Sequence, residues 1–178
     1  MWPLLIVLAV AVWLVILYNG LVQLRESAEA AWADIDVQLK RRYDLIPNLV
    51  ETVKGYARHE RETLESVIQA RNRAMAAQGP EAEGALAGAL KSLFALSEAY
   101  PQLQAASGFR DLQETLSEVE SNLSQARRYY NAVVRDLNTR VQTFPTVFIA
   151  RAFGFGQREF FEIDETERAV PQVSFDED

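Results

Sequence analysis

The residue best suited to proton transfer in this chain is His59, because it is the only histidine and imidazole titrates near neutral pH. His59-Glu60 opens like the helix of a zinc protease, but that motif needs a second histidine at the position of Thr63. One histidine also cannot supply the two Glu-x-x-His units of a di-iron bundle. We expect His59 to be a surface or helix-interface residue. A serine activated by His59 stays open as an alternative, although no Gly-x-Ser-x-Gly elbow occurs.

Other catalytic chemistry finds no support in the spacing of reactive residues. The chain has no cysteine, which excludes thiolate nucleophiles, thiolate metal sites and disulfides. The acidic pairs Asp34/Asp36 and Glu60/Glu62 are two residues apart, so on a helix they point to different faces. The glycines form no phosphate-binding loop. The sequence therefore predicts no enzyme, no metal and no cofactor.

The net charge of −7 is concentrated at the C-terminal end. Residues 159–178 carry eight acidic side chains against Arg168 alone, whereas the rest of the chain is balanced. A nucleic-acid-binding protein needs a basic stripe to neutralise phosphates, so we predict no nucleic-acid partner. The same balance argues against a broadly basic, membrane-hugging surface. The acidic residues 162–178 form a third region, which we expect to be disordered.

The residues most suggestive of a binding site lie in one cluster between positions 40 and 48. It brings basic, aromatic, acidic and amide side chains together near a proline. Its candidate interaction residues are Arg41, Arg42, Tyr43, Asp44, Pro47 and Asn48. The simpler interpretation is helix-corner chemistry, because basic residues favour the C-terminal end of a helix. The alternative is a recognition tip held between two helices.

Phenylalanine marks a second candidate surface between positions 144 and 161. Six of the nine phenylalanines lie there, and the candidate interaction residues among them are Phe153, Phe155, Phe160 and Phe161. One interpretation is a C-terminal strap that covers the end of a helical bundle. The other is an exposed aromatic hook that docks on a partner or on the bilayer interface.

The element that would hold these residues at a membrane is an apolar run over residues 2–18, within an uncharged stretch that ends at Arg25. At 1.5 Å per residue it just spans a hydrocarbon core of about 30 Å. A cleaved signal peptide is the competing interpretation, but the run has no basic start and ends in Leu17-Tyr18-Asn19-Gly20, a poor cleavage site. The downstream cations predict an N-terminus outside and a cytoplasmic C-terminal domain.

The rest of the chain shows helical periodicity and no strand-like alternation. Apolar spacing predicts helices over about 21–43, 47–77, 81–99 and 107–144, with breaks at Pro47, Pro80 and Pro101. A single kinked helix through Pro47 is the alternative to a corner there. We predict an all-α fold, in which one transmembrane helix (residues 1–20) precedes an antiparallel up-and-down four-helix bundle (residues 21–161).

The stretch from Asp36 to Val50, Asp-Val-Gln-Leu-Lys-Arg-Arg-Tyr-Asp-Leu-Ile-Pro-Asn-Leu-Val, resembles the signature of the LemA family. Its continuation through Ala70-Arg71, together with Tyr100-Pro101, Tyr130-Asn131, Phe144-Pro145 and Phe153-Gly154-Phe155, is similar to that family too. The resemblance implies an N-terminal membrane helix and a helical-bundle domain in a bacterial cell membrane. It implies no catalytic residues.

From these features we expect a membrane-anchored, non-enzymatic scaffold or adaptor. Its partners would be the lipid bilayer through residues 2–18, membrane-associated proteins, and other copies of itself as a homo-oligomer. A lipid-surface or membrane-remodelling module is the first alternative, and a hydrolase with an unrecognised site near His59 is the second.

Overall fold

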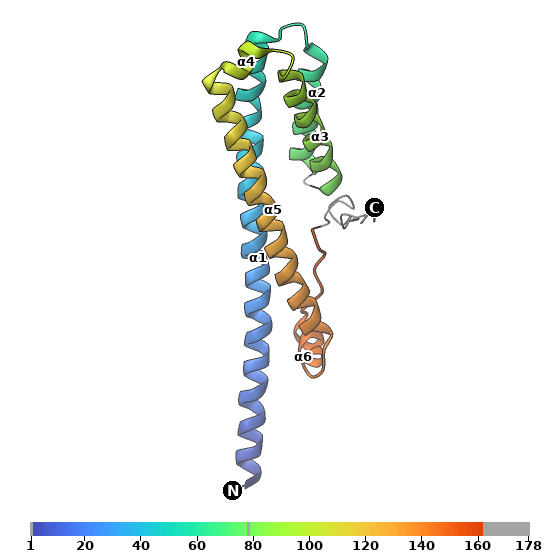
Figure 1. Cartoon of the computed structure of the whole chain (residues 1–178). Coiled ribbons are helices and arrows are strands. Elements are labelled where there is room, and N and C mark those ends of the chain that lie inside the picture. The colour runs from blue at the N-terminus through green and yellow to red at the C-terminus, as the bar shows by residue number, and fades with distance from the viewer. Residues whose placement is uncertain (1, 78, 162–178) are drawn as a thin grey trace, which may run out of the picture. The chain divides into compact units, whose positions relative to one another are not determined.

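The computed structural model describes residues 2–77 and 79–161, and within these residues it contains helices and no strand. The helices, labelled in Figure 1, are α1 (Trp2–Tyr56), α2 (Arg61–Ala77), α3 (Pro80–Ser97), α4 (Pro101–Ala105), α5 (Ser107–Gln142) and α6 (Thr146–Phe153). The all-helical prediction is confirmed, as is the long apolar helix at the N-terminus. The predicted disordered tail, residues 162–178, lies outside the described residues.

The predicted corner at Pro47 is wrong, because α1 continues through this proline as far as Tyr56. The predicted anchor and the helix predicted over residues 21–43 therefore belong to one helix. The first turn of the chain follows α1, where the Ala57 amide donates to the Val53 carbonyl and the Glu60 amide donates to the Ala57 carbonyl. The next helix begins only at Arg61.

A side chain from α2 explains how α1 tolerates its internal proline. Proline has no N–H, so Pro47 leaves the carbonyl oxygen of Tyr43, four residues earlier, without its helical donor. Arg71 Nε donates to that carbonyl oxygen at 2.7 Å. A side chain from outside the helix thereby supplies the hydrogen bond that this carbonyl lacks. The helix need not break to let water bond to it.

The chain divides into two compact units, and α1 and α5 contribute to both. Unit 1 contains residues 2–41 and 117–161, and unit 2 contains residues 42–116. We describe each unit by itself.

Unit 2 has an apolar core to which α2, α3 and α4 contribute together with parts of α1 and α5. Fully buried side chains come from the end of α1, from α2, α3 and α4, and from the start of α5: Ile46, Leu49, Val53, Val67, Leu86, Leu93, Leu103 and Phe109. The rings of Phe94 and Phe109 meet edge to face, with centroids 6.2 Å apart. Tyr100 donates its hydroxyl to Glu60 Oε1 at 3.1 Å, which ties the start of α4 to the turn before α2.

Unit 1 packs one face of α1 against one face of α5. The buried aliphatic residues recur at three- and four-residue spacing on both helices, which is the pattern of a helix–helix seam. They are Leu21, Ala28, Ala31, Ile35 and Leu39 on α1, and Val119, Leu123, Val133, Val134 and Leu137 on α5. Polar and charged residues occupy the opposite faces.

Helix α6 was not predicted as a helix, and it closes the end of unit 1. It begins at Thr146, whose single hydroxyl proton lies within reach of two carbonyl oxygens of the preceding turn, those of Thr143 and Arg140. Gly154 ends it in the left-handed conformation, with φ of 74°, so that the Phe155 amide can donate to the Ala150 carbonyl. The Val147 and Phe148 amides donate to the Thr143 and Pro145 carbonyl oxygens, so both ends of α6 depend on local backbone hydrogen bonds.

Candidate functional site

The single histidine, His59, lies in the turn between α1 and α2. His59 is exposed, and it lies outside every helix. Among residues 2–77 and 79–161, no three or more histidine and acidic side chains gather closely enough to hold a metal ion.

The cluster between positions 40 and 48 lies on the continuous helix α1, and the structure divides it by burial. Its exposed members are Arg41, Asp44, Pro47 and Asn48. Arg42 and Tyr43 are 3% and 5% exposed. The cluster is therefore not a single tip, and two of its six candidate residues face the interior of unit 2.

The two buried members of the cluster share one carboxylate. Arg42 Nη1 lies 3.0 Å from Glu83 Oε2, and the side chains of this pair are 4% and 2% exposed. The Tyr43 hydroxyl donates to the other oxygen, Glu83 Oε1. Both carboxylate oxygens of Glu83 are engaged, which is what a buried charge requires. The arrangement joins α1 to α3 and is structural in character.

Unit 1 contains an extended segment held by side chains of α5. This segment, residues 155–161, is called the strap below. Asn138 donates from Nδ2 to the Arg158 carbonyl at 2.8 Å and accepts from the Arg158 amide at 2.9 Å. Asn131 pairs in the same way with Phe161, at 2.8 Å in both directions. Each amide thus satisfies a donor and an acceptor of the strap, as a neighbouring β-strand would.

The C-terminal end of the strap is fixed by aromatic packing. Phe161 is 4% exposed, with its ring centroid 5.9 Å from that of Trp32 and 4.6 Å from the Arg127 guanidinium carbon. Tyr130 stacks edge-on against Trp32 and donates its hydroxyl to the Glu159 carbonyl at 3.0 Å. Partial burial raises the pKa of Tyr130 above its usual value, while the charge of Arg158 opposes that rise. The hydroxyl is therefore a neutral donor throughout the physiological range.

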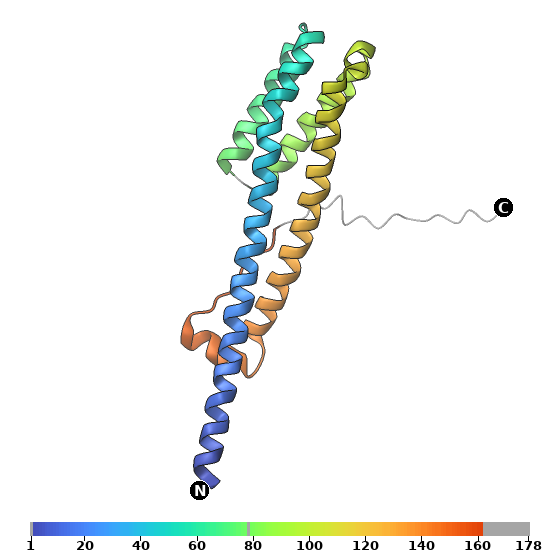
Figure 2. The same cartoon turned by 90° about the vertical axis from the view of Figure 1, so that its left-hand side faces the viewer.

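The N-terminal end of the strap joins α6 to α1. Leu21, Ile149 and Ala150 form a buried cluster against which Leu17 and Phe155 pack. The ring of Tyr18 lies edge-on to Phe153 at 4.9 Å and to Phe155 at 5.7 Å. Figures 1 and 2 both show α6 beside α1 at this level.

Three phenylalanines around α6 have largely exposed side chains, including Phe153, which contacts Tyr18 along one edge. Phe144, Phe148 and Phe153 are 76%, 64% and 65% exposed. The rings of Phe144 and Phe148 pack edge to face with each other, at 6.1 Å. Of the four candidate phenylalanines, Phe161 is buried, Phe155 is half-buried, and Phe153 and Phe160 are exposed.

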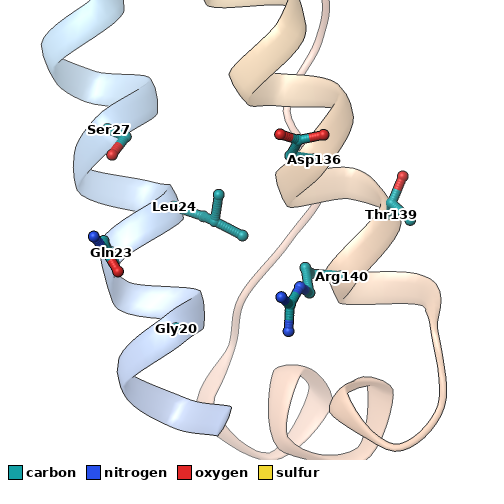
Figure 3. A pocket seen from close by; sticks show the side chains of 7 residues that line it. All are labelled: Gly20, Gln23, Leu24, Ser27, Asp136, Thr139 and Arg140. Carbon is teal, nitrogen blue, oxygen red and sulfur yellow. The ribbon is translucent and has the colours of Figure 1, made fainter. Parts of the chain in front are cut away.

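A polar groove opens between α1 and α5 near the same end of unit 1 (Figure 3). Its volume is about 500 Å³, and its lining residues are Gly20, Gln23, Leu24, Ser27, Asp136, Thr139 and Arg140. In Figure 3 the guanidinium of Arg140 extends into the space between the two helices. The lining contains one carboxylate and no histidine, so the groove can bind polar groups but offers no acid–base pair.

Sequence reasoning missed the residues that organise these features, namely Glu83, Arg71, Asn131 and Asn138. The asparagines carried a readable signal. They stand seven residues apart within the apolar seam of α5, where a buried amide needs partners. Glu83 and Arg71 carried no such signal, because their partners are distant in sequence.

These observations define an all-helical protein whose first helix is long and apolar enough at its N-terminal end to cross a membrane. Residues 31–175 match the LemA family. Since this match covers most of the sequence, the chain belongs to the LemA family, as its motifs predicted.

Several curated relatives show what the chain is similar to. Magnetosome protein MamQ of Magnetospirillum gryphiswaldense is 24% identical over 88% of this chain and 70% of its own length. Magnetosome protein MamQ 2 of Paramagnetospirillum magneticum is 24% identical over 82% of this chain and 64% of its own length. Protein LemA of Metamycoplasma hominis is 24% identical over 88% of this chain and 74% of its own length. The chain therefore spans about two thirds to three quarters of these relatives.

Proposed function

We propose that this protein is a membrane-anchored, non-enzymatic scaffold or adaptor that presents its helices to protein partners. The observation that carries the proposal is the continuity of α1. From Trp2 to Ile16 its large apolar side chains are exposed, whereas from Leu21 onward one face of the same helix is buried. An exposed apolar stretch of this length fits a bilayer, and no loop interrupts the helix between that stretch and the packed units.

The proposed scaffold is an antiparallel up-and-down bundle of α1, α2, α3 and α5. The proposal also assigns the side of the membrane on which the packed units lie. Arg25, Lys40 and Arg41 follow the apolar stretch, which favours a bacterial cell membrane with the packed units on the cytoplasmic side. With no native cysteine, a His59→Cys variant has a single thiol. We expect an impermeant maleimide to label it only after the membrane is permeabilised, and labelling in intact cells would reverse the assignment.

Photo-crosslinking in cells tests the adaptor role. A photoreactive amino acid would replace Asn48 or Tyr129, which are both exposed, and Val53, which is fully buried, would serve as the matched control. We expect discrete protein adducts from the exposed positions and none from the control. Adducts to the same chain would identify a homo-oligomeric scaffold.

An enzymatic role makes the opposite prediction. Purified protein that turns over a substrate, and loses turnover in a His59→Ala variant that remains folded, would overturn the non-enzymatic assignment. Because His59 is exposed and outside the helices, this substitution should leave the circular dichroism spectrum unchanged.

A further inference from the structure

The segment around α6 has an unusual charge and aromatic content for a surface of this protein. Between Asp136 and Glu159 the sequence contains no acidic side chain and three arginines, Arg140, Arg151 and Arg158. Residues 1–136 carry 14 basic and 17 acidic side chains, so this segment is a local cationic exception. Arg158 is engaged with Glu29 at 2.6 Å, whereas Arg140 and Arg151 are exposed.

The position of α6 on α1 coincides with the end of the apolar stretch. Its buried face packs on Leu17 and Leu21, and Phe153 contacts Tyr18. The residues of α1 that precede this contact are apolar and exposed, from Trp2 to Ile16. Their span is about 22 Å at 1.5 Å per residue, shorter than a hydrocarbon core of about 30 Å. A bilayer that surrounds this stretch therefore reaches the level of α6.

We propose that α6 and the turn before it are an interfacial lipid-binding element. Phe144, Phe148 and Phe153 insert at the boundary between headgroups and acyl chains, in the leaflet that α1 leaves at Tyr18. Helix α6 is then a short interfacial helix, with its buried face on α1 and its exposed rings in lipid. This inference rests on the proposed anchoring by α1, and it adds a second, separate contact with the bilayer.

Lipid is the occupant that the surroundings of these rings favour. Aromatic side chains are enriched at membrane interfaces, and arginines suit the anionic phosphates that lie beside them. A protein partner at the same place would have to displace the headgroups next to α1. At the start of α6 the Val147 and Phe148 amides donate to the Thr143 and Pro145 carbonyl oxygens, and at its end the Gly154 and Phe155 amides donate to Ala150. These backbone groups are therefore already paired where the exposed rings meet the bilayer.

Site-directed spin labelling of the full-length protein tests the inference. The protein would be reconstituted into vesicles of phosphatidylcholine and phosphatidylglycerol. Because the chain has no cysteine, each variant carries one label: Phe144→Cys, Phe148→Cys, Phe153→Cys, Leu8→Cys or Tyr129→Cys. Collision rates with oxygen, which concentrates in lipid, and with a water-soluble nickel chelate then report the depth of each label.

Leu8 and Tyr129 provide the matched controls. Leu8 lies in the apolar stretch of α1 and reports anchoring itself, while Tyr129 is a 57% exposed aromatic residue on α5 of the same unit. We expect the oxygen-to-nickel collision ratio at positions 144, 148 and 153 to be several-fold higher than at position 129. It should remain below the ratio at position 8, because an interfacial label lies at a shallower depth.

The outcomes separate this inference from the proposed function. Ratios at 144, 148 and 153 equal to that at 129, with a high ratio at position 8, would overturn the lipid contact and leave the anchor intact. A low ratio at position 8 would overturn the anchor and the inference together. Circular dichroism of each labelled variant confirms that the exposed substitutions leave the helices formed.

Discussion

The two units of this molecule hold polar groups inside an apolar core by different means. Unit 2 buries an ionised pair, Arg42 with Glu83, between α1 and α3. Unit 1 buries neutral amides, Asn131 and Asn138, and uses them to hold the main chain of the strap. An unpaired buried charge is far more costly than an unpaired amide. Unit 2 is therefore built to keep its helices together, whereas the strap of unit 1 is held by hydrogen bonds that can be exchanged for water.

Removing the carboxylate of unit 2 should give the largest effect. A Glu83→Leu substitution takes the carboxylate away from the buried Arg42 guanidinium, and we expect a loss of about 3–5 kcal/mol in the free energy of unfolding. Urea unfolding of the purified protein in detergent, followed by circular dichroism, measures it. The double variant Arg42→Met/Glu83→Leu is the control, because an apolar pair of similar volume should recover most of the loss. Equal losses in the single and double variants would contradict the charge argument.

Breaking an asparagine of unit 1 should have a smaller and more local effect. Asn131→Ala removes two hydrogen bonds to Phe161 and leaves its amide and carbonyl unpaired, at a cost of about 1–3 kcal/mol. Since 1.4 kcal/mol corresponds to about tenfold in an equilibrium, trypsin should cut after Arg158 at least several-fold faster. Asn122→Ala, on the same helix but away from the strap, should not change the cleavage rate. Global unfolding at the same rate as cleavage would show that the strap is not a separate unit of opening.

The hydrogen bond from Arg71 to the Tyr43 carbonyl, which compensates for Pro47, belongs to unit 2 and can be tested separately. Arg71→Leu removes the donor to the Tyr43 carbonyl, and we expect a loss of about 1–2 kcal/mol in the free energy of unfolding. In a Pro47→Ala background the helix regains its own N–H donor, so the same substitution should cost less. A double-mutant cycle in urea measures this coupling. Equal costs in both backgrounds would show that Arg71 does not compensate for the proline.

The smallest effect is expected from the exposed ion pair that joins the strap to α1. Arg158 and Glu29 lie 2.6 Å apart, but their side chains are 30% and 52% exposed, so the pair is screened by solvent. Glu29→Gln should lower the free energy of unfolding by less than about 1 kcal/mol. High salt should remove the difference between this variant and the parent protein, whereas a difference that persists in salt would point to packing.

The parts of this fold that could be predicted are those set by local sequence. The seam of α5 and the break before α3 follow from apolar periodicity and from Pro80, and both lie close to their predicted positions. The prediction at Pro47 failed because the missing hydrogen bond is supplied by Arg71, which is 28 residues away from Tyr43 in sequence. Helix propensity depends on nearby residues and so cannot predict a hydrogen bond from a residue this distant in sequence.

The candidate residues show the same limit. The residue types between positions 40 and 48 and their closeness in sequence identified Arg42 and Tyr43 as candidates. They did not predict that both side chains are buried, because that depends on Glu83, about forty residues further on. Phe153 and Phe161 are residues of the same type in the same segment, yet Phe153 is 65% exposed and Phe161 is 4% exposed. The difference arises from α6 and its cap at Gly154, which turn the chain back along α5. The phenylalanine content predicted an interaction segment at residues 144–161. Only the packing shows which of its phenylalanines are exposed and which are buried.

The asparagine pairing has an evolutionary consequence. The side chains of Asn131 and Asn138 bond to the amide and carbonyl of Phe161 and Arg158, groups that every residue except proline presents alike. These four hydrogen bonds therefore demand only that proline is avoided at positions 158 and 161 and that the spacing between these positions is kept. Selection on residue type in the strap would act instead where a side chain packs, as the buried ring of Phe161 does against Trp32.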